Sequence, residues 1–123
     1  MNNVAGYLDW NESGTQAVFR ETWEETGLDL EYLLNHSEIL GYNLDQPWHV
    51  KTTPDENQQN ISLRYGVLLT VDELPELCLD YNEIPGEVED PMWLPVKEID
   101  NYKWAFNHDI VIKEYMKKFR IIQ

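Results

Sequence analysis

The chain has 123 residues, of which 42% are apolar and 12% aromatic, so it has the length of a typical domain and enough apolar side chains for a core. It carries 23 Asp and Glu against 9 Lys and Arg, a formal net charge of −14. Such a surface repels nucleic-acid backbones and anionic membranes, so we expect neither nucleic-acid groove binding nor a membrane partner. A polyanionic substrate would need positive charge from elsewhere, and metal ions are the expected source.

Three further features narrow the class of protein. No apolar run approaches the roughly 20 residues of a membrane span. The first residues lack the basic and apolar regions of a signal peptide. Cys78 is the sole cysteine, which excludes an internal disulfide, and we expect it to be a small buried apolar residue rather than a nucleophile. We therefore expect a single domain over residues 1–123, located in the cytoplasm.

A helix is predicted over residues 14–26. Ser13 and Gln16, three places apart, form a capping-box pattern, in which each side chain bonds the other residue's backbone N–H. Gly27 suits the left-handed position just past a helix end. The segment between Ser13 and Gly27 contains no proline.

The remaining patterns predict strands separated by polar loops. Residues 61–69 alternate and then become continuously apolar, which predicts the best strand of the chain, in a central position. Pro95 favours an edge for the strand that contains it. In chain order, we also expect a short strand at 39–42, a polar loop over 43–59, an acidic loop over 72–90, an edge strand at 92–96 and a final helix capped by Asn107.

Three acids on the predicted helix share one face. Glu21, Glu24 and Glu25 lie at positions i, i+3 and i+4, where each pair of like charges costs roughly 0.2–0.5 kcal/mol. Mg²⁺ or Mn²⁺ would offset this repulsion, because both ions prefer carboxylate oxygens and water. In so acidic a chain a solvated acidic face explains the same spacing, and for the glutamates alone that alternative is favoured.

A wider motif changes this weighting. Gly6, Glu12 and the run Arg20-Glu21-Thr22-Trp23-Glu24-Glu25-Thr26-Gly27-Leu28 resemble the Nudix box, G-x5-E-x7-R-E-U-x-E-E-x-G-U with U aliphatic. Every fixed letter is present at the right spacing, and only Thr22 departs, at an aliphatic position. The resemblance implies an α/β (α+β) fold, with a mixed β-sheet flanked by helices.

The resemblance also implies roles within the box. Glu21, Glu24 and Glu25 would bind Mg²⁺ or Mn²⁺, and Arg20 would orient these carboxylates. The outer positions of the motif would support them: Glu12 would help to hold Arg20 or a metal-bound water, and Gly6 would let the backbone approach the metal closely.

The reaction implied is metal-dependent hydrolysis of a nucleoside diphosphate linked to another group, for example ADP-ribose, a dinucleotide or an oxidised nucleotide. The general base would be Glu21, or a later glutamate, with Glu87 preferred over Glu89. A Nudix-fold binding or regulatory module with little turnover is the alternative. Candidates for stacking on the base are Trp48, Tyr65 and Trp104, each of which is equally explained by packing, and His108 is a weaker candidate for substrate contact.

One departure from the family concerns the start of the chain. Members of the family usually carry the first strands of the sheet ahead of the box, whereas here the box begins at Gly6. We therefore expect an N-terminally shortened sheet. Because an unpaired strand over 61–69 would favour association, we also expect a homodimer or a strand-exchanged assembly.

Overall fold

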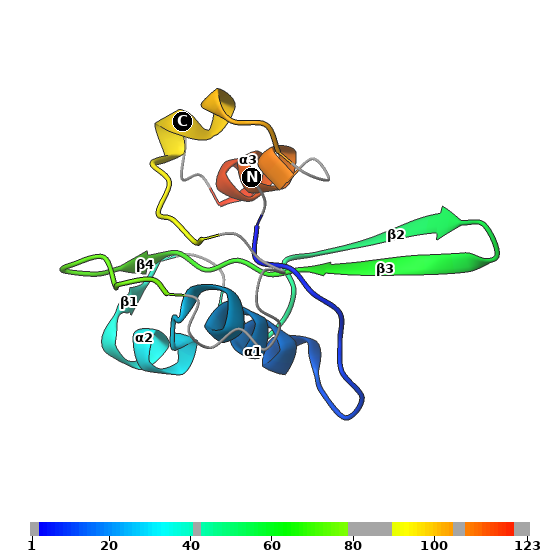
Figure 1. The fold of residues 1–123 in the computed structure, drawn as a ribbon, viewed down its shortest axis with the longest axis horizontal. Coiled ribbons are helices and arrows are strands. Elements are labelled where there is room, and N and C mark those ends of the chain that lie inside the picture. Colours follow the sequence, from blue (N-terminus) through cyan, green and yellow to red (C-terminus); the bar gives the residue numbers. More distant parts are fainter. Residues whose placement is uncertain (1–2, 41–42, 79–89, 105–107, 120–123) are drawn as a thin grey trace.

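The computed structural model describes residues 3–40, 43–78, 90–104 and 108–119. Helices come first along the described chain, short antiparallel strands follow, and further helical segments come last, which confirms the mixed α/β class (Figure 1). In chain order the elements are α1 (Gly14–Thr26), α2 (Leu30–His36), β1 (Glu38–Ile39), β2 (His49–Asp55), β3 (Gln58–Arg64), β4 (Leu69–Thr70), the 3-10 helix η1 (Val96–Asn101) and α3 (His108–Lys118). Within the described ranges, no helix is long and apolar enough to cross a bilayer.

Helix α1 begins and ends where the sequence predicts. The Ser13 hydroxyl accepts the Gln16 N–H at 3.1 Å, and the Gln16 side chain accepts the Ser13 N–H at 2.9 Å, so both halves of the capping box form. Gly27 ends the helix at φ 74°, and its N–H donates to the Trp23 carbonyl. These bonds connect residues at most four apart, and for this reason the local sequence suffices to set them.

Helix α2 was not predicted. The Asp29 carboxylate caps it by accepting the Tyr32 N–H at 3.1 Å. At the other end, the His36 ring stacks on Tyr32 with 4.0 Å between centroids. An aspartate three residues before an apolar run is a helix-start signal, but seven residues are too few for an apolar period to stand out.

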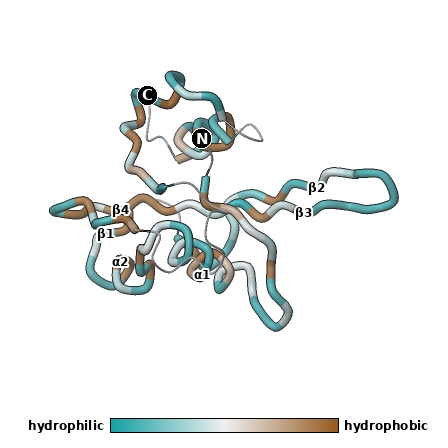
Figure 2. The backbone as a smooth tube through the Cα atoms, viewed as in Figure 1, coloured by the Kyte–Doolittle hydropathy of each residue, from teal (hydrophilic) through white to brown (hydrophobic). Residues whose placement is uncertain are grey.

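The predicted loop over 43–59 is wrong in its second half, because residues 49–55 form strand β2. It pairs with β3 as an antiparallel hairpin in the register His49 to Arg64 through Asp55 to Gln58. Asn57 turns the chain at φ 64°, a left-handed conformation that asparagine tolerates. The hairpin extends away from the helices, and its tip is hydrophilic (Figures 1 and 2).

The predicted central strand over 61–69 also needs correction. Strand β3 ends at Arg64, and residues 65–68 are irregular before β4, which pairs with β1. The strand predicted at 39–42 is this short β1, and residues 41–42 lie outside the described residues. Among the described strands, β3 bonds only to β2, so it lies in a two-stranded sheet and not at the centre of a larger one.

The predicted edge strand at 92–96 is wrong. Residues 91–95 have no regular structure, and Val96 begins η1, whose N-cap is Pro95 at φ −58°. Proline supplies no N–H for a strand ladder but suits the start of a helical turn, which accounts for the difference. The final helix is confirmed as α3, whereas its predicted cap, Asn107, lies outside the described residues.

The buried apolar side chains come from the loop before β2, from η1 and from α3. In the described part of the chain they are Leu44, Trp48, Ile99 and Met116. The Trp48 ring meets the Tyr115 ring edge-on at 5.5 Å, which fixes α3 over the base of the hairpin. Cys78 is partly exposed rather than fully buried, and its N–H donates to the Thr26 carbonyl.

Candidate active site

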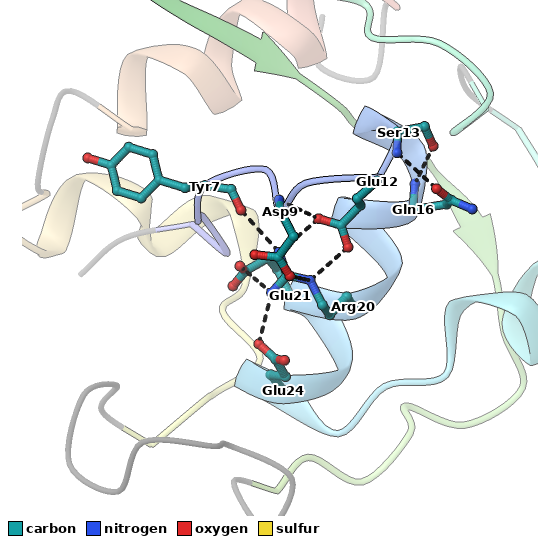
Figure 3. Close-up of polar contacts among 8 residues, drawn as sticks. All are labelled: Tyr7, Asp9, Glu12, Ser13, Gln16, Arg20, Glu21 and Glu24. Atoms are coloured by element: carbon teal, nitrogen blue, oxygen red, sulfur yellow. Dashed lines mark hydrogen bonds and ion pairs between the residues drawn. The ribbon is translucent and has the colours of Figure 1, made fainter.

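The box residues lie on α1 and on the loop before it, and Arg20 is at their centre. Its Nε–H donates to Glu12 Oε2 at 2.8 Å, and its Nη2 donates to Glu12 Oε1 at 3.0 Å. This bidentate pairing joins the loop to the helix, as Figure 3 shows. Glu12 therefore orients the guanidinium, which is one of the two roles expected of it.

The same guanidinium reaches two of the acids on α1. Arg20 Nη1 donates to Glu21 Oε1 at 2.7 Å and to Glu24 Oε2 at 3.2 Å. The side chains of Glu21 and Glu24 are only 17% and 18% exposed, so solvent screens these ion pairs less than at an open surface. Arg20 thus gathers carboxylates that would otherwise repel one another.

Two further contacts complete the surroundings of Arg20. Its Nη2 donates to the Tyr7 carbonyl at 3.1 Å, and its Nε lies 3.2 Å from Asp9 Oδ2 (Figure 3). Neither partner was predicted. Asp9 is an acid in the variable part of the motif, three residues before Glu12, which was the available signal. Nothing in the local sequence specifies that its side chain turns toward Arg20.

The pKa values within the cluster follow from this pairing. The hydrogen bond from Arg20 lowers the pKa of Glu12, with help from the Asp9 N–H. The same bond raises the pKa of Arg20 above its usual value, with Glu21 contributing next among the favourable partners. Both groups are therefore charged at neutral pH, and the cluster is anionic around one fixed cation.

Glu25 differs from its neighbours because its environment favours the protonated form. Burial, then the charge of Glu21 and a hydrogen bond with that side chain, raise the pKa of Glu25 to about 7. The Ala5 N–H donates to Glu25 Oε2 at 3.3 Å and opposes the shift. The carboxyl groups of Glu25 and Glu21 are thus close enough to share a proton. A bound cation could replace that proton.

Gly6 lies directly against this pair of acids. A Cβ added at Gly6 would overlap the carboxylate group of Glu21, so a side chain at this position would displace the acid. The backbone at Gly6 therefore lies close to the Glu21 carboxylate, and its close approach to a metal ion stays a prediction.

The three glutamates predicted to bind a metal ion are not assembled as a finished site. Within the described ranges, no three His, Cys, Asp or Glu side chains are arranged to hold an ion. Arg20 bonds both Glu21 and Glu24. The donor set still suits a hard divalent cation, since Glu21 and Glu25 crowd together beside open backbone at Gly6. Glu24 could join them by turning away from Arg20, because its 3.2 Å bond is the longer of the two that Arg20 Nη1 donates.

The structure places the three aromatic candidates on separate elements. Trp48 is buried at 9% exposure under α3, and the Trp104 indole donates to the Ile99 carbonyl at 2.7 Å. The Tyr65 hydroxyl lies where a Cβ on Gly14 would be, at the start of α1. No contact among the three is found in the described residues, and their substrate roles stay predictions. Glu87 and Glu89 lie outside the described residues.

An open groove of about 340 Å³ runs between α1 and α2, on another side of the box helix. Its lining includes Arg20 and Trp23 from α1 and Glu31 from α2. Glu21, Glu24 and Glu25 do not line it, so Arg20 is the residue that the groove shares with the acidic cluster. Thr22, the box position that departs from the pattern, is buried on α1 at 8% exposure, so it occupies an interior site as an aliphatic residue would.

A helix carrying three acids, organised by an arginine and supported by a glycine-containing loop, defines an acidic class of site. The family model described as the NUDIX domain matches residues 2–115, and the chain therefore belongs to the Nudix hydrolase family. The chain is 31% identical over 96 residues to "Nudix hydrolase 19, chloroplastic" of Arabidopsis thaliana, a match that covers 78% of this chain. It spans only 18% of that relative's length. No solved structure matches the chain significantly.

Proposed function

We propose that this protein hydrolyses the pyrophosphate bond of a nucleoside diphosphate linked to another group, with Mg²⁺ or Mn²⁺ held by Glu21, Glu24 and Glu25. The observation that carries the proposal is the Arg20-centred carboxylate cluster, formed by the complete box motif of a Nudix family member. Family membership supports a small nucleotide as the substrate. A substrate such as ADP-ribose fits, although the base and the second group are not specified.

The residues of the chain divide the work as follows. Glu12 holds the Arg20 fork, and Arg20 in turn holds Glu21 and Glu24 on the helix face. Gly6 leaves room for the carboxylate of Glu21, where any side chain would intrude. When bound, the divalent ions neutralise phosphate oxygens and lower the pKa of a coordinated water.

The general base is either Glu21 or Glu87, with Glu89 as a further candidate. Glu21 is already beside Gly6 and Glu25, which favours it on proximity. Replacing each by glutamine distinguishes the two, because loss of the base lowers kcat across the whole pH profile. If Glu87→Gln abolishes turnover but keeps metal affinity while Glu21→Gln weakens the affinity, the later glutamate is the base.

The aromatic residues would supply the contacts to the nucleobase. Tyr65 and Trp104 are the better placed of the three candidates, because Trp48 is buried against Tyr115. Substituting Tyr65→Leu or Trp104→Leu would then raise KM for the nucleotide more than it lowers kcat. An unchanged KM in both variants would assign these rings to packing.

The test of the proposal is a panel of nucleoside diphosphate derivatives assayed with Mg²⁺, with Mn²⁺ and with chelator. We expect hydrolysis only with a metal ion, reduced by at least tenfold in Glu24→Gln and Glu25→Gln. The control is Glu31→Gln on α2, an exposed acid outside the box helix. Hydrolysis that persists with chelator, or that survives both box substitutions, contradicts the proposed mechanism.

A regulatory or binding module with little turnover is the second candidate. The observation that favours it is that Arg20 occupies both Glu21 and Glu24, so the carboxylates need rearrangement before three of them can hold an ion. Metal-independent nucleotide binding without phosphate release across the whole panel would support this candidate over the enzyme.

The hairpin supports a proposal that two copies of the chain associate. Val50, Ile61 and Leu63 are 52%, 67% and 38% exposed, and their register places them on one face. Residues 49–64 carry two basic and two acidic side chains, so this part of a strongly acidic chain is neutral. A second copy could therefore approach here with less repulsion than elsewhere. Sedimentation at micromolar concentration tests this, and a stable monomer contradicts it.

A further inference from the structure

The segment over residues 3–6 connects the last helix to the acids of α1. The Asn3 N–H donates to His108 Nδ1, at the start of α3, at 2.9 Å. Two residues later, the Ala5 N–H donates to Glu25, and Gly6 lies against Glu21. In Figure 1 the first described residues lie next to α3, and the chain then runs toward the loop before α1. Residues 3–6 therefore contact both the start of α3 and the acids of α1.

Helix α3 is itself fixed to the rest of the molecule. The Trp48 and Tyr115 rings pack edge to face, and Lys118 Nζ donates to the Trp48 carbonyl at 3.2 Å. The Arg64 guanidinium lies 3.3 Å from the Glu114 carboxylate. Helix α3, which carries His108, is therefore held by three contacts with residues at the base of the hairpin.

The His108 ring is in the right protonation state to act as the anchor. To accept the Asn3 N–H, Nδ1 must carry a lone pair, so the ring must be neutral with its proton on Nε2. Burial, and secondarily the charge of Arg64, lower the pKa of His108, while Asp109 raises it by a smaller amount. The balance favours the neutral ring at physiological pH, and hence the acceptor.

We propose that His108 is a positioning residue for the metal-binding carboxylates: its Nδ1 holds Asn3 and thereby seats residues 3–6 against Glu25 and Glu21. The role of the carboxylates rests on the proposed function, but the contact itself does not. His108 acts through the backbone at Asn3, Ala5 and Gly6 and is not a catalytic residue. The connection joins residues 105 positions apart in the chain.

Three variants separate the contact from general stability. His108→Leu removes the acceptor, whereas His108→Asn places an amide oxygen near the position of Nδ1. Asn3→Pro removes the donor and leaves the histidine intact, since proline has no N–H. The matched control is His36→Leu on α2, whose ring stacks on Tyr32 of the same helix.

Two measurements are made on each full-length variant. The first is amide hydrogen exchange at Asn3 and Ala5 in metal-free protein, with Asn3 omitted for the proline variant. The second is Mn²⁺ affinity, followed by electron paramagnetic resonance. We expect His108→Leu and Asn3→Pro to speed exchange and weaken Mn²⁺ binding by about three- to tenfold, the range of one hydrogen bond. We expect exchange and Mn²⁺ affinity in His108→Asn and His36→Leu to stay close to those of the unmodified chain. The double variant His108→Leu with Asn3→Pro should lose no more Mn²⁺ affinity than either single variant.

The outcomes separate this inference from the proposed function. If the unmodified chain binds no Mn²⁺, the proposed function fails, while exchange at Ala5 still decides whether His108 holds the segment. Unchanged exchange in both His108→Leu and Asn3→Pro overturns the inference. Faster exchange with unchanged Mn²⁺ affinity overturns the positioning role. If His108→Leu does not fold, the comparison of Asn3→Pro with His108→Asn decides the same question.

Discussion

The box region, residues 3–28, and the hairpin β2–β3 are held together by different interactions. In the box region one guanidinium joins Asp9, Glu12, Glu21 and Glu24, and most of these carboxylates are sheltered from solvent. In the hairpin the backbone ladder joins seven pairs of residues, and nearly all side chains are exposed. The first region depends on particular side chains, and the second depends on the main chain.

This difference indicates where the molecule is specialised. Gathering like charges is unfavourable unless a cation offsets them, so under the proposed function the box region gives up stability for a metal site. The exposed hairpin contains no comparable cluster among its residues and should accept substitution readily. Changes in the two regions should therefore differ in size and in kind.

The largest effect is expected for Gly6→Ala. The added methyl group must push the flexible carboxylate of Glu21 away, which displaces a proposed metal ligand without disturbing the core. We expect metal-dependent hydrolysis and Mn²⁺ affinity to fall at least tenfold, with little change in the thermal midpoint. The hairpin control is Asn57→Gly, which suits the left-handed φ of 64° and should leave both quantities unchanged. Equal activity of Gly6→Ala and the unmodified chain would mean that Glu21 is not a metal ligand.

Arginine-to-glutamine substitutions compare the two regions directly. Arg20→Gln leaves Glu12, Glu21 and Glu24 without their shared cation, so we expect the free energy of unfolding to fall by about 1–2 kcal/mol. Arg64→Gln breaks a single ion pair to Glu114 and should cost about 0.5 kcal/mol. Denaturant unfolding of both variants at low and high salt measures this contrast. Equal losses of unfolding free energy in Arg20→Gln and Arg64→Gln would contradict the expected contrast.

The pH dependence of metal-free stability should identify Glu25. Because the folded-state pKa of Glu25 is raised from the ordinary 4.5 to about 7, the folded chain holds this proton more tightly than the unfolded chain. The contribution is complete below pH 4.5 and is lost as pH rises through 7. Glutamine cannot ionise. Between pH 5 and 8 we therefore expect the free energy of unfolding of Glu25→Gln to rise by about 1 kcal/mol relative to that of the unmodified chain, after discounting for solvent screening.

Chemical denaturation at several pH values, with and without Mn²⁺, provides this measurement. Saturating Mn²⁺ should stabilise the unmodified chain at pH 8 and leave Glu25→Gln nearly unaffected. A parallel pH profile for the two proteins would place the shared proton elsewhere.

The smallest effect is expected on the hairpin. Ile61→Thr keeps a β-branched residue at an exposed strand position, so the unfolding free energy of dilute protein should change by less than about 0.5 kcal/mol. If two copies meet at this face, the same substitution should shift the sedimentation of concentrated protein toward the monomer. A large loss of stability in dilute protein would mean that the hairpin side chains pack more than their exposure indicates.

The box helix was predicted better than the strands. The box residues and the support of Arg20 by Glu12 follow from a motif whose members lie within 23 positions, and the Ser13 and Gly27 caps follow from bonds within α1. The strand expected at 92–96 failed because alternation over five residues does not distinguish an edge strand from irregular chain. A single domain over 1–123 and the base Glu87 stay predictions.

The amino-acid order alone determined the box helix, its two caps and the face on which the acids gather, because a helix places residues i, i+3 and i+4 together whatever surrounds it. Only the tertiary structure decided that Asp9 and the Tyr7 carbonyl turn to Arg20, that β2 pairs with β3, and that Asn3 meets His108. These contacts close loops through the folded chain. Their partners are selected by what the rest of the molecule brings within hydrogen-bonding distance, and no local pattern encodes that choice.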